Sequence, residues 1–314
     1  MLVLIAFAGI CAGGLLGLMV ASAKGFIGAS KAPAEVRAKG DQTLRVVTLN
    51  LAHGRGLAPN QALVESDVIS SNLRETARYL DALEADIVGL QEVDKDCNWS
   101  GNCSQADDIA KRAGFREYKL GVNNHRAGRY QLVYGNALLS DLPVLECQNY
   151  PFSDSSIGGK GFLVADVKIG GRVLTVCVLH LAPVGKGARR RQVQNIIGAL
   201  KNRENPLVVM GDFNCELGRD NVLEEMCEAL ELDTPRRGEG AGDTFRFLRG
   251  RRIDYIFSSR SLRVSNYHVG EAELSDHRPV ICDVHLAPES GETEGPVGSR
   301  SKYTQADTGE VCKT

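Results

Sequence analysis

The stretch VVMGDFNCELG, residues 208–218, joins an apolar strand pattern to two polar residues. Three apolar residues open it, and Asp212 and Asn214 follow on either side of Phe213. Because strand side chains alternate between two faces, we expect Asp212 and Asn214 to point the same way and Phe213 to enter the core. Gly211 allows backbone or ligand to approach closely. A carboxylate beside an amide donor at the end of a buried strand suits a phosphate better than a sugar or a peptide.

Strand and helix patterns alternate on both sides of this stretch. Apolar runs typical of strands occupy residues 43–51, 85–93, 135–140, 161–169, 172–181, 206–214, 252–259 and 279–286. Helical spacing occupies residues 73–85, 188–201 and 221–231. Gly170 and Gly171, between two of the strands, indicate a hairpin. Hairpins mixed with crossover helices predict an α/β fold of layered, mixed sheets.

Polar residues with metal or acid–base chemistry stand at or near the ends of these strands. They are Asn50, Glu92, His180, Asp212, Asn214, Asp254, Asp276 and His277. Taken singly, each has an ordinary explanation, such as a turn residue for Asn50 or a hydrogen-bonded core histidine for His180. Together they favour convergence on one rim of the sheets, because a buried carboxylate is costly unless it is paired or bound to a metal.

Five motifs along the body resemble the endonuclease/exonuclease/phosphatase superfamily. In chain order they are QEVD (91–94), VLHLAP (178–183), GDFN (211–214), RRIDYIF (251–257) and SDHRPV (275–280). The resemblance covers residues 43–287 and implies a four-layer α/β sandwich, with two mixed β-sheets packed face to face and helices on the outside. It also implies hydrolysis of phosphoesters, foremost phosphodiesters, with a divalent cation, usually Mg²⁺ and alternatively Mn²⁺.

The resemblance also assigns a metal site. Glu92 matches the principal metal ligand of the family, with Asp276 nearby and Asn50 assisting. Mg²⁺ prefers a few carboxylate ligands supplemented by water molecules.

The catalytic and substrate-binding roles follow from the same resemblance. His277 matches the general base or transition-state stabiliser, Asp254 the carboxylate that orients it, and Asp212 the residue that places the attacking water or the leaving-group proton. Asn214 matches a phosphate-oxygen donor. His180 matches the histidine of the deoxyribonuclease and sphingomyelinase branches, and two histidines can divide the base and acid roles. Asn136 is expected to support His180 or the substrate.

The two ends of the chain differ from the body. Residues 2–23 carry no charge and are long enough to span a bilayer. They also end in Ala-Ser-Ala, the small-x-small form of a cleavage site. We expect a signal peptide or membrane anchor at 1–23 and a linker at 24–42. The protein would then be exported, to the periplasm or beyond, or anchored in a membrane. Residues 288–314 have a composition typical of disorder, which leaves 43–287 as one catalytic domain, expected to be monomeric.

The remaining composition limits the other classes of function. A net charge of −2 gives no general attraction to nucleic acid, and no cysteine–histidine spacing typical of zinc occurs. Cys97 and Cys103 flank a polar loop that a disulfide could close, whereas Cys177, Cys215 and Cys282 read as buried apolar residues. No motif surrounds four of the six histidines, so surface or packing roles are expected for His53, His125, His268 and His285.

The substrate stays open between several classes. A nuclease needs a cationic track for phosphates, which Arg189, Arg190 and Arg191, or the arginines in 246–252, could supply, although a solvated helix face is an equal alternative. A phospholipid headgroup agrees better with the N-terminal segment. An inositol phosphatase would require more lysines near the site than the sequence places there. Outside the enzymes, a catalytically inactive binding module is the competing class.

Overall fold

The computed structural model describes residues 43–128, 131–153, 159–235, 242–247, 251–286 and the backbone of Glu310–Val311. All of them belong to the compact unit Ala32–Thr314. The signal or anchor expected at 1–23 and the linker at 24–42 lie outside these residues, as does the tail expected at 288–314 apart from the strand at Glu310–Val311. No helix among the described residues is long and apolar enough to cross a membrane.

Two mixed sheets form the body of the domain. In spatial order, the first consists of β11 (Arg263–Val269), β12 (Val280–His285), β1 (Thr43–Asn50), β2 (Ile87–Asp94), β4 (Leu132–Ser140), β3 (Glu117–Arg126) and β13 (Glu310–Val311). The second consists of β5 (Val144–Pro151), β6 (Gly161–Ile169), β7 (Arg172–His180), β8 (Leu207–Asp212), β10 (Asp254–Ser259) and β9 (Leu232–Asp233). Each sheet contains parallel and antiparallel pairs: β1 is parallel to β2 and antiparallel to β12, and β8 is parallel to β7 and antiparallel to β10.

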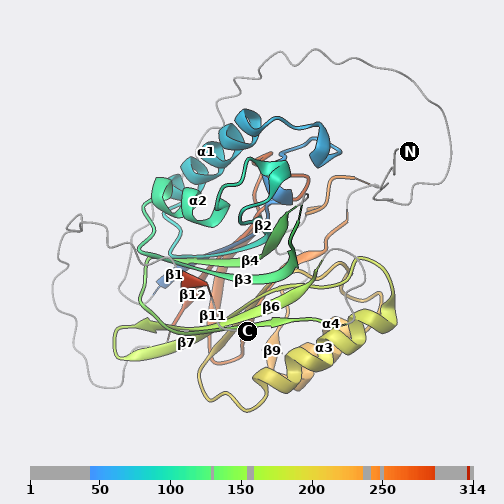
Figure 1. Ribbon diagram of the computed structural model, residues 1–314. Coiled ribbons are helices and arrows are strands. Elements are labelled where there is room, and N and C mark those ends of the chain that lie inside the picture. Colours follow the sequence, from blue (N-terminus) through green and yellow to red (C-terminus); the bar gives the residue numbers. More distant parts are fainter. Residues whose placement is uncertain are drawn as a thin grey trace. The chain divides into compact units, whose positions relative to one another are not determined.

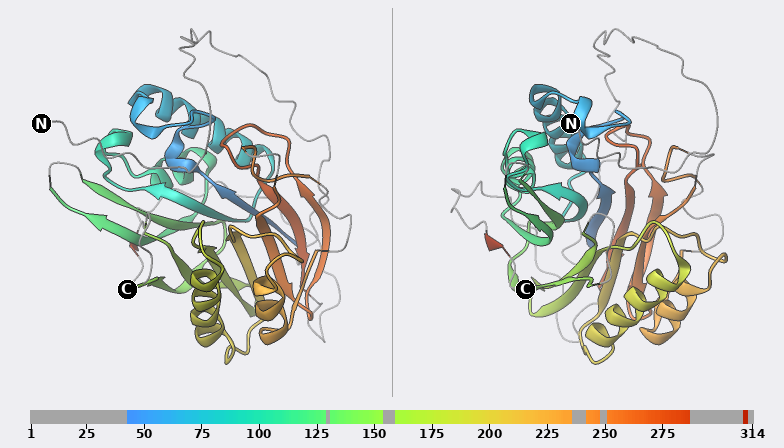
Figure 2. Two further views of the ribbon diagram at one scale, coloured as in Figure 1. Left: turned by 90° about the vertical axis from the view of Figure 1, so that its right-hand side faces the viewer. Right: turned by 45° about the vertical axis from the view of Figure 1, so that its right-hand side comes forward.

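Helices cover the outer face of each sheet. Helices α1 (Ser66–Ala82) and α2 (Gln105–Ala113) lie over the first sheet, and α3 (Lys186–Leu200) and α4 (Val222–Ala229) over the second (Figure 1). Short 3-10 turns occur at η1 (Ala52–Gly54), η2 (Gln61–Leu63) and η3 (Asn98–Ser100). The same layers are visible from two further directions in Figure 2. The four-layer sandwich expected from the sequence is confirmed.

The apolar side chains divide into three clusters that follow these layers. One lies between the sheets and contains Val46 and Met210. A second lies between the first sheet and its helices and contains Val47, and a third lies under α3 and α4 and contains Val209. Successive residues of one strand thus enter different clusters, which is the period-2 alternation of a strand buried on both faces.

Residues 208–218 follow this pattern as far as Asp212. Asp212 has the parity of Met210 and so belongs to the face between the sheets, whereas Phe213 is fully buried in the cluster under the helices, as expected. The strand ends at Asp212. Asn214 has φ +52°, so the expectation that the strand continues to residue 214 is wrong. The chain turns there because Asn tolerates the left-handed conformation.

Candidate active site

The strand ends that carry polar residues meet at one rim of the sandwich. In the second sheet, His180 pairs with Asp212, and Asp212 pairs with Asp254 on its other side. In the first sheet, the last residue of β1, Asn50, pairs with Gln91. Asn50 Nδ2 donates to Asp212 Oδ2 at 3.1 Å, which joins the two sheets directly at this rim.

A continuous series of polar contacts runs through the rim. Lys160 Nζ lies 3.0 Å from Glu92 Oε1 and 3.2 Å from His180 Nδ1. His180 Nε2 lies 3.1 Å from Asp212 Oδ2, and His277 Nε2 lies 3.8 Å from the same oxygen. These contacts join five side chains into one site: Glu92, Lys160, His180, Asp212 and His277. All of them except Glu92 are buried.

His277 and Asp254 form a buried pair. His277 Nδ1 lies 2.9 Å from Asp254 Oδ2, and the Asp254 backbone N–H donates to Thr244 Oγ1 at 3.1 Å. Burial lowers the pKa of His277, but Asp254 and Asp212 outweigh it and raise that pKa to about 10. Burial raises the pKa of Asp254. The ring of Phe245 packs 4.9 Å from the imidazole and shields the pair.

Asp212 is the acceptor at the centre of the site. Besides Asn50 and the two histidines, the backbone N–H of Asn214 donates to its Oδ1 at 2.9 Å. Burial alone would raise the pKa of Asp212, but His180 and His277 lower it to about 2. Asp212 is therefore ionised at neutral pH. The side-chain Nδ2 of Asn214 donates to Leu181 O at 2.9 Å, so the structure shows this amide tied to the backbone after β7.

Glu92 and Asp276 lie on either side of Arg55. Arg55 Nη2 donates to Asp276 Oδ2, and Arg55 Nη1 lies 3.9 Å from Glu92 Oε2. Burial would raise the pKa of Glu92, but Lys160, His53 and further cations hold it well below its usual value. The carboxylates of Glu92 and Asp276, with the amide of Asn50, are hard oxygen donors that fit Mg²⁺ or Mn²⁺. Lys160 supplies positive charge at Glu92 Oε1, and Arg55 supplies it at Glu92 Oε2 and Asp276 Oδ2.

Asp212, Asp254 and His277 form another group of metal-binding residue types. Their ligand atoms all lie within 4.8 Å of one another. Asp254 Oδ1 is buried without a hydrogen-bond partner among the described residues. The contact between Asp254 and His277 Nδ1 has the geometry of a hydrogen bond, so this group also fits an acid–base pair beside an acceptor.

A sequence model of the Endonuclease/Exonuclease/phosphatase family matches residues 47–277. The chain belongs to this family. The family is generally hydrolytic and includes nucleases, phosphatases and phosphodiesterases, and the matched region contains every site residue discussed above.

Individual relatives are more distant. Two UPF0294 proteins of Vibrio vulnificus, from strains YJ016 and CMCP6, are each 29% identical over 119 residues, which is 37% of this chain and 41% of the relative. The aligned part thus spans less than half the length of these relatives.

Solved structures share the fold. An endonuclease/exonuclease/phosphatase from Beutenbergia cavernae is 21% identical, with a TM-score of 0.64 over 78% of this chain and 72% of the other. Sphingomyelinase C from Streptomyces griseocarneus is 18% identical, with a TM-score of 0.55 over 77% and 99%. A beta toxin mutant from Staphylococcus aureus, with bound magnesium ions, is 15% identical, with a TM-score of 0.57 over 78% and 99%.

The family motifs do not mark every polar residue of the site. His53 Nδ1 lies 2.6 Å from Asp94 Oδ1, Trp99 Nε1 donates to Asp94 Oδ2 at 2.7 Å, and His53 Nε2 lies 3.5 Å from Glu92. His53 also packs against the rings of Trp99 and Tyr134, at centroid distances of 5.0 and 4.9 Å, which agrees with the packing role expected for it, and its contact with Glu92 places it beside the site as well. Its position three residues after Asn50, at the end of β1, was the available signal. Lys160 was also missed, although it stands between two glycines just before a predicted strand.

Asn136 is joined to the predicted site through backbone atoms. It is buried on β4, and its Nδ2 donates across the sandwich to Gly161 O of β6 at 2.9 Å. Gly161 pairs with His180. None of the described hydrogen bonds joins Asn136 to another predicted site side chain, so its contacts are those of a brace between the sheets beside His180.

The structure contradicts the disulfide considered for two cysteines and confirms the burial expected for three others. Cys97 and Cys103 are free thiols, so the disulfide considered for this loop is absent. The thiol of Cys97 instead lies 3.1 Å from both the N and the O of Val133 on β4. Cys177, Cys215 and Cys282 are buried, as expected.

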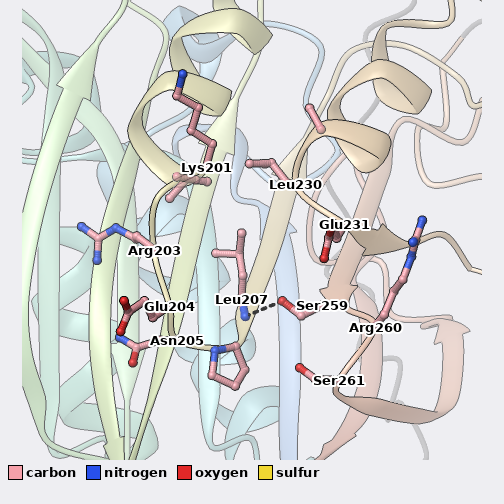
Figure 3. Close-up of a pocket in the computed structure, with 13 residues that line it drawn as sticks. Lys201, Arg203, Glu204, Asn205, Leu207, Leu230, Glu231, Ser259, Arg260 and Ser261 are labelled. Atoms are coloured by element: carbon pink, nitrogen blue, oxygen red, sulfur yellow. Dashed lines mark hydrogen bonds between the residues drawn. The ribbon is translucent and has the colours of Figure 1, made fainter.

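The family site is distinct from a polar cavity of about 350 Å³ at the opposite end of β8 and β10. Leu207 and Ser259, which line this cavity, are joined by a hydrogen bond of 2.8 Å (Figure 3). Lys201, Arg203 and Arg260 point away from one another in the close-up.

Proposed function

We propose that this domain is a divalent-metal-dependent phosphodiesterase that activates a water molecule against the phosphorus atom. The observation that carries the proposal is the unbroken series of contacts from Glu92 through Lys160, His180 and Asp212 to His277. Phosphodiester hydrolysis needs an acceptor for the proton of water and donors for the developing negative charge. The side chains of this series provide both the proton acceptor and the donors, within a few ångströms of one another.

Glu92, Asp276 and Asn50 would hold Mg²⁺ or Mn²⁺. When bound there, the cation supplies charge neutralisation at a phosphoryl oxygen. The magnesium ions in the related beta toxin support this assignment, as does the hard-oxygen character of the donor set.

The side chains of this domain supply the proton transfers. Asp212, ionised and held by Asn50 and His180, accepts the proton of the attacking water. His277, protonated through its contacts with Asp254 and Asp212, donates to the phosphoryl oxygen or the leaving alkoxide. His180 orients Asp212.

Asn214 and Asn136 have supporting roles in this proposal. The Asn214 backbone fixes one oxygen of Asp212, and the second N–H of its side-chain amide can donate to a phosphate oxygen. Asn136 positions β6 through its hydrogen bond to Gly161 O, and Gly161 pairs with His180 of β7.

The charged surface favours a short substrate over a long nucleic acid. The arginines that the sequence offered as a phosphate track have acidic partners in four cases: Arg189 with Asp220, Arg190 with Glu225, Arg246 with Glu273 and Arg251 with Glu216. Arg252 lies over the rings of Tyr255 and Tyr267. Arg249 lies outside the described residues. Paired arginines attract polyphosphate less, since a phosphate must compete with the carboxylate.

Apolar side chains near the site favour a lipid headgroup. Leu57, two residues after Arg55, is 41% exposed, and Val184, four after His180, is 64% exposed. Phe247, 42% exposed, contacts the Phe245 ring that packs on His277. Contact with an apolar partner is expected where such groups form one contiguous patch, whereas single exposed apolar residues are normal on a protein surface. A signal or anchor in residues 2–23, as expected from the sequence, would bring the domain to such a surface.

The decisive experiment is hydrolysis of bis-p-nitrophenyl phosphate with Mg²⁺ or Mn²⁺ and then with EDTA. We expect metal-dependent turnover that falls by about 10²–10⁴-fold in Asp212→Asn, the range for removal of an acid–base group. Asp233→Asn is the matched control, because this aspartate is exposed at the end of the second sheet.

Turnover on sphingomyelin, glycerophospholipid, plasmid DNA and inositol phosphates then separates the substrate classes. We expect a phospholipid to rank first. Absence of metal-dependent turnover on every class would identify an inactive binding module instead.

A further inference from the structure

Lys160 lies at the junction of the two halves of the site. Its ammonium contacts Glu92, from β2 of the first sheet, at 3.0 Å and His180, from β7 of the second, at 3.2 Å. The lysine side chain is only 8% exposed. A buried ammonium is costly unless an anion or acceptor compensates for the lost water, so its position depends on the charge of Glu92.

The backbone around Lys160 is fixed on both sides of the side chain. Lys160 O accepts a hydrogen bond from Phe152 N at 2.9 Å, and Gly161 O accepts one from Asn136 at 2.9 Å. A Cβ at Gly161 would lie 2.7 Å from Tyr150 O, so only glycine permits this approach of the strands. Because the backbone is held, the part of Lys160 that can move is its flexible four-carbon side chain.

A cation on Glu92 changes the balance of charge at Lys160. It neutralises the carboxylate that holds the ammonium and repels the ammonium itself. The ammonium is then attracted to any other anion that comes within reach of its stem. In the proposed reaction, the anion that enters this place is the phosphoryl group of the substrate.

Arg55, the other cation beside Glu92, is held differently. Its guanidinium donates to Ala58 O at 2.9 Å and to Ala52 O at 3.1 Å as well as to Asp276. Two backbone oxygens thus fix Arg55. The contacts of Lys160 with Glu92 and His180 are both made to side chains of the site.

We propose that Lys160 is a phosphate-binding residue: it neutralises Glu92 in the metal-free protein and turns to the phosphoryl oxygens when a cation occupies Glu92. This inference rests on the proposed function and extends it to a residue that no sequence motif marks.

The test measures two ligands separately. Calorimetric titration with Mn²⁺ alone gives the metal affinity, and titration of the Mn²⁺-loaded protein with inorganic phosphate gives the anion affinity. In Lys160→Gln we expect Mn²⁺ to bind at least about fivefold more tightly, because a like charge is removed. We expect phosphate to bind at least about tenfold more weakly, because a charge-assisted hydrogen bond is lost.

Changes of opposite sign distinguish this role from a structural one. A lysine that only supports the fold would weaken both ligands together or affect neither, and either result overturns the inference. Lys160→Arg, which keeps the charge, is expected to retain phosphate binding within about threefold. Lys168→Gln is the matched control and is expected to change neither affinity, because Lys168 is exposed on β6, the strand that follows Lys160.

Cooperative unfolding in urea checks that Lys160→Gln is folded. If it is not, Lys160→Met, which keeps the apolar stem, is titrated with both ligands, and the same changes in affinity are expected. If the wild-type protein binds no Mn²⁺, the proposed function fails together with the inference. Normal Mn²⁺ binding by the wild type, with phosphate affinity unchanged in the variants that remove the charge, Lys160→Gln or Lys160→Met, overturns the inference alone.

Discussion

At the scale of single residues, Asp212 separates two imidazoles whose pKa values shift in opposite directions. Burial, and then the ammonium of Lys160, lower the pKa of His180. Asp254 and Asp212 raise that of His277 to about 10 in spite of burial. His180 is therefore neutral at pH 7, and its contact with Lys160 at Nδ1 leaves the proton on Nε2, facing Asp212. The two histidines thus divide the roles of orienter and acid.

The shift of His277 predicts how stability depends on pH. Its folded pKa of about 10 exceeds the usual 6.5. The contribution to stability is therefore complete below pH 6.5 and is lost as the pH rises through 10. We expect the free energy of unfolding in urea with EDTA to fall more steeply between pH 7 and pH 10 in the wild type than in His277→Gln. His268→Gln serves as the control, because His268 is exposed, and its free energy of unfolding should depend on pH as that of the wild type does. Parallel curves for wild type and His277→Gln would contradict the assignment.

At the scale of elements, strand periodicity aims the site residues that lie in regular strands, and one irregularity aims Glu92. Asn50, His180 and Asp254 have the parity of neighbours in the cluster between the sheets. Glu92 has the parity of Leu90, which faces the helices. A register shift between Leu90 and Val93, with φ +52° at Glu92, turns this carboxylate towards Lys160. Bulges often re-aim side chains beside active sites.

Gly211 offers a test at the same scale. It has φ +145°, and a Cβ there would lie 2.0 Å from Leu179 O of the neighbouring strand. We expect Gly211→Ala to lower the free energy of unfolding by about 2 kcal/mol or more, from backbone strain and overpacking together. Gly198→Ala, on the exposed face of α3 with nothing within 4 Å, should be neutral or stabilise by up to about 1 kcal/mol. Urea denaturation of both variants measures the difference, and equal effects would show that the strand contact is not tight.

At the scale of the whole molecule, the site joins the two sheets at the end where both expose polar groups. Asn50 and Glu92 come from the first sheet, and His180, Asp212 and Asp254 from the second. A ligand that binds this rim contacts both layers and must stabilise the folded domain as a whole, since it binds the native state only.

Metal binding should therefore raise the melting temperature. At Mn²⁺ concentrations about 100 times the dissociation constant, the gain is about 2.7 kcal/mol, or about 5–10 °C for a domain of this size. We expect thermal denaturation to show this rise in the wild type and in Glu204→Gln, whose glutamate is exposed beside the distant cavity. Glu92→Gln should lose the rise. A rise of the same size in Glu92→Gln would place the cation elsewhere, and the Asp212, Asp254 and His277 group would then be the alternative.

The sequence by itself determined the family fold and which motif residues stand at the strand ends, because local periodicity and strand boundaries are encoded in consecutive residues. It did not yield strands β3, β5 and β11, whose burial is mixed and whose patterns are correspondingly weak. Only the tertiary structure decided that Lys160 contacts Glu92 and that His53 contacts Asp94. Contacts of this kind depend on a bulge and on the packing of two sheets, and neither is encoded in the residues that flank each side chain.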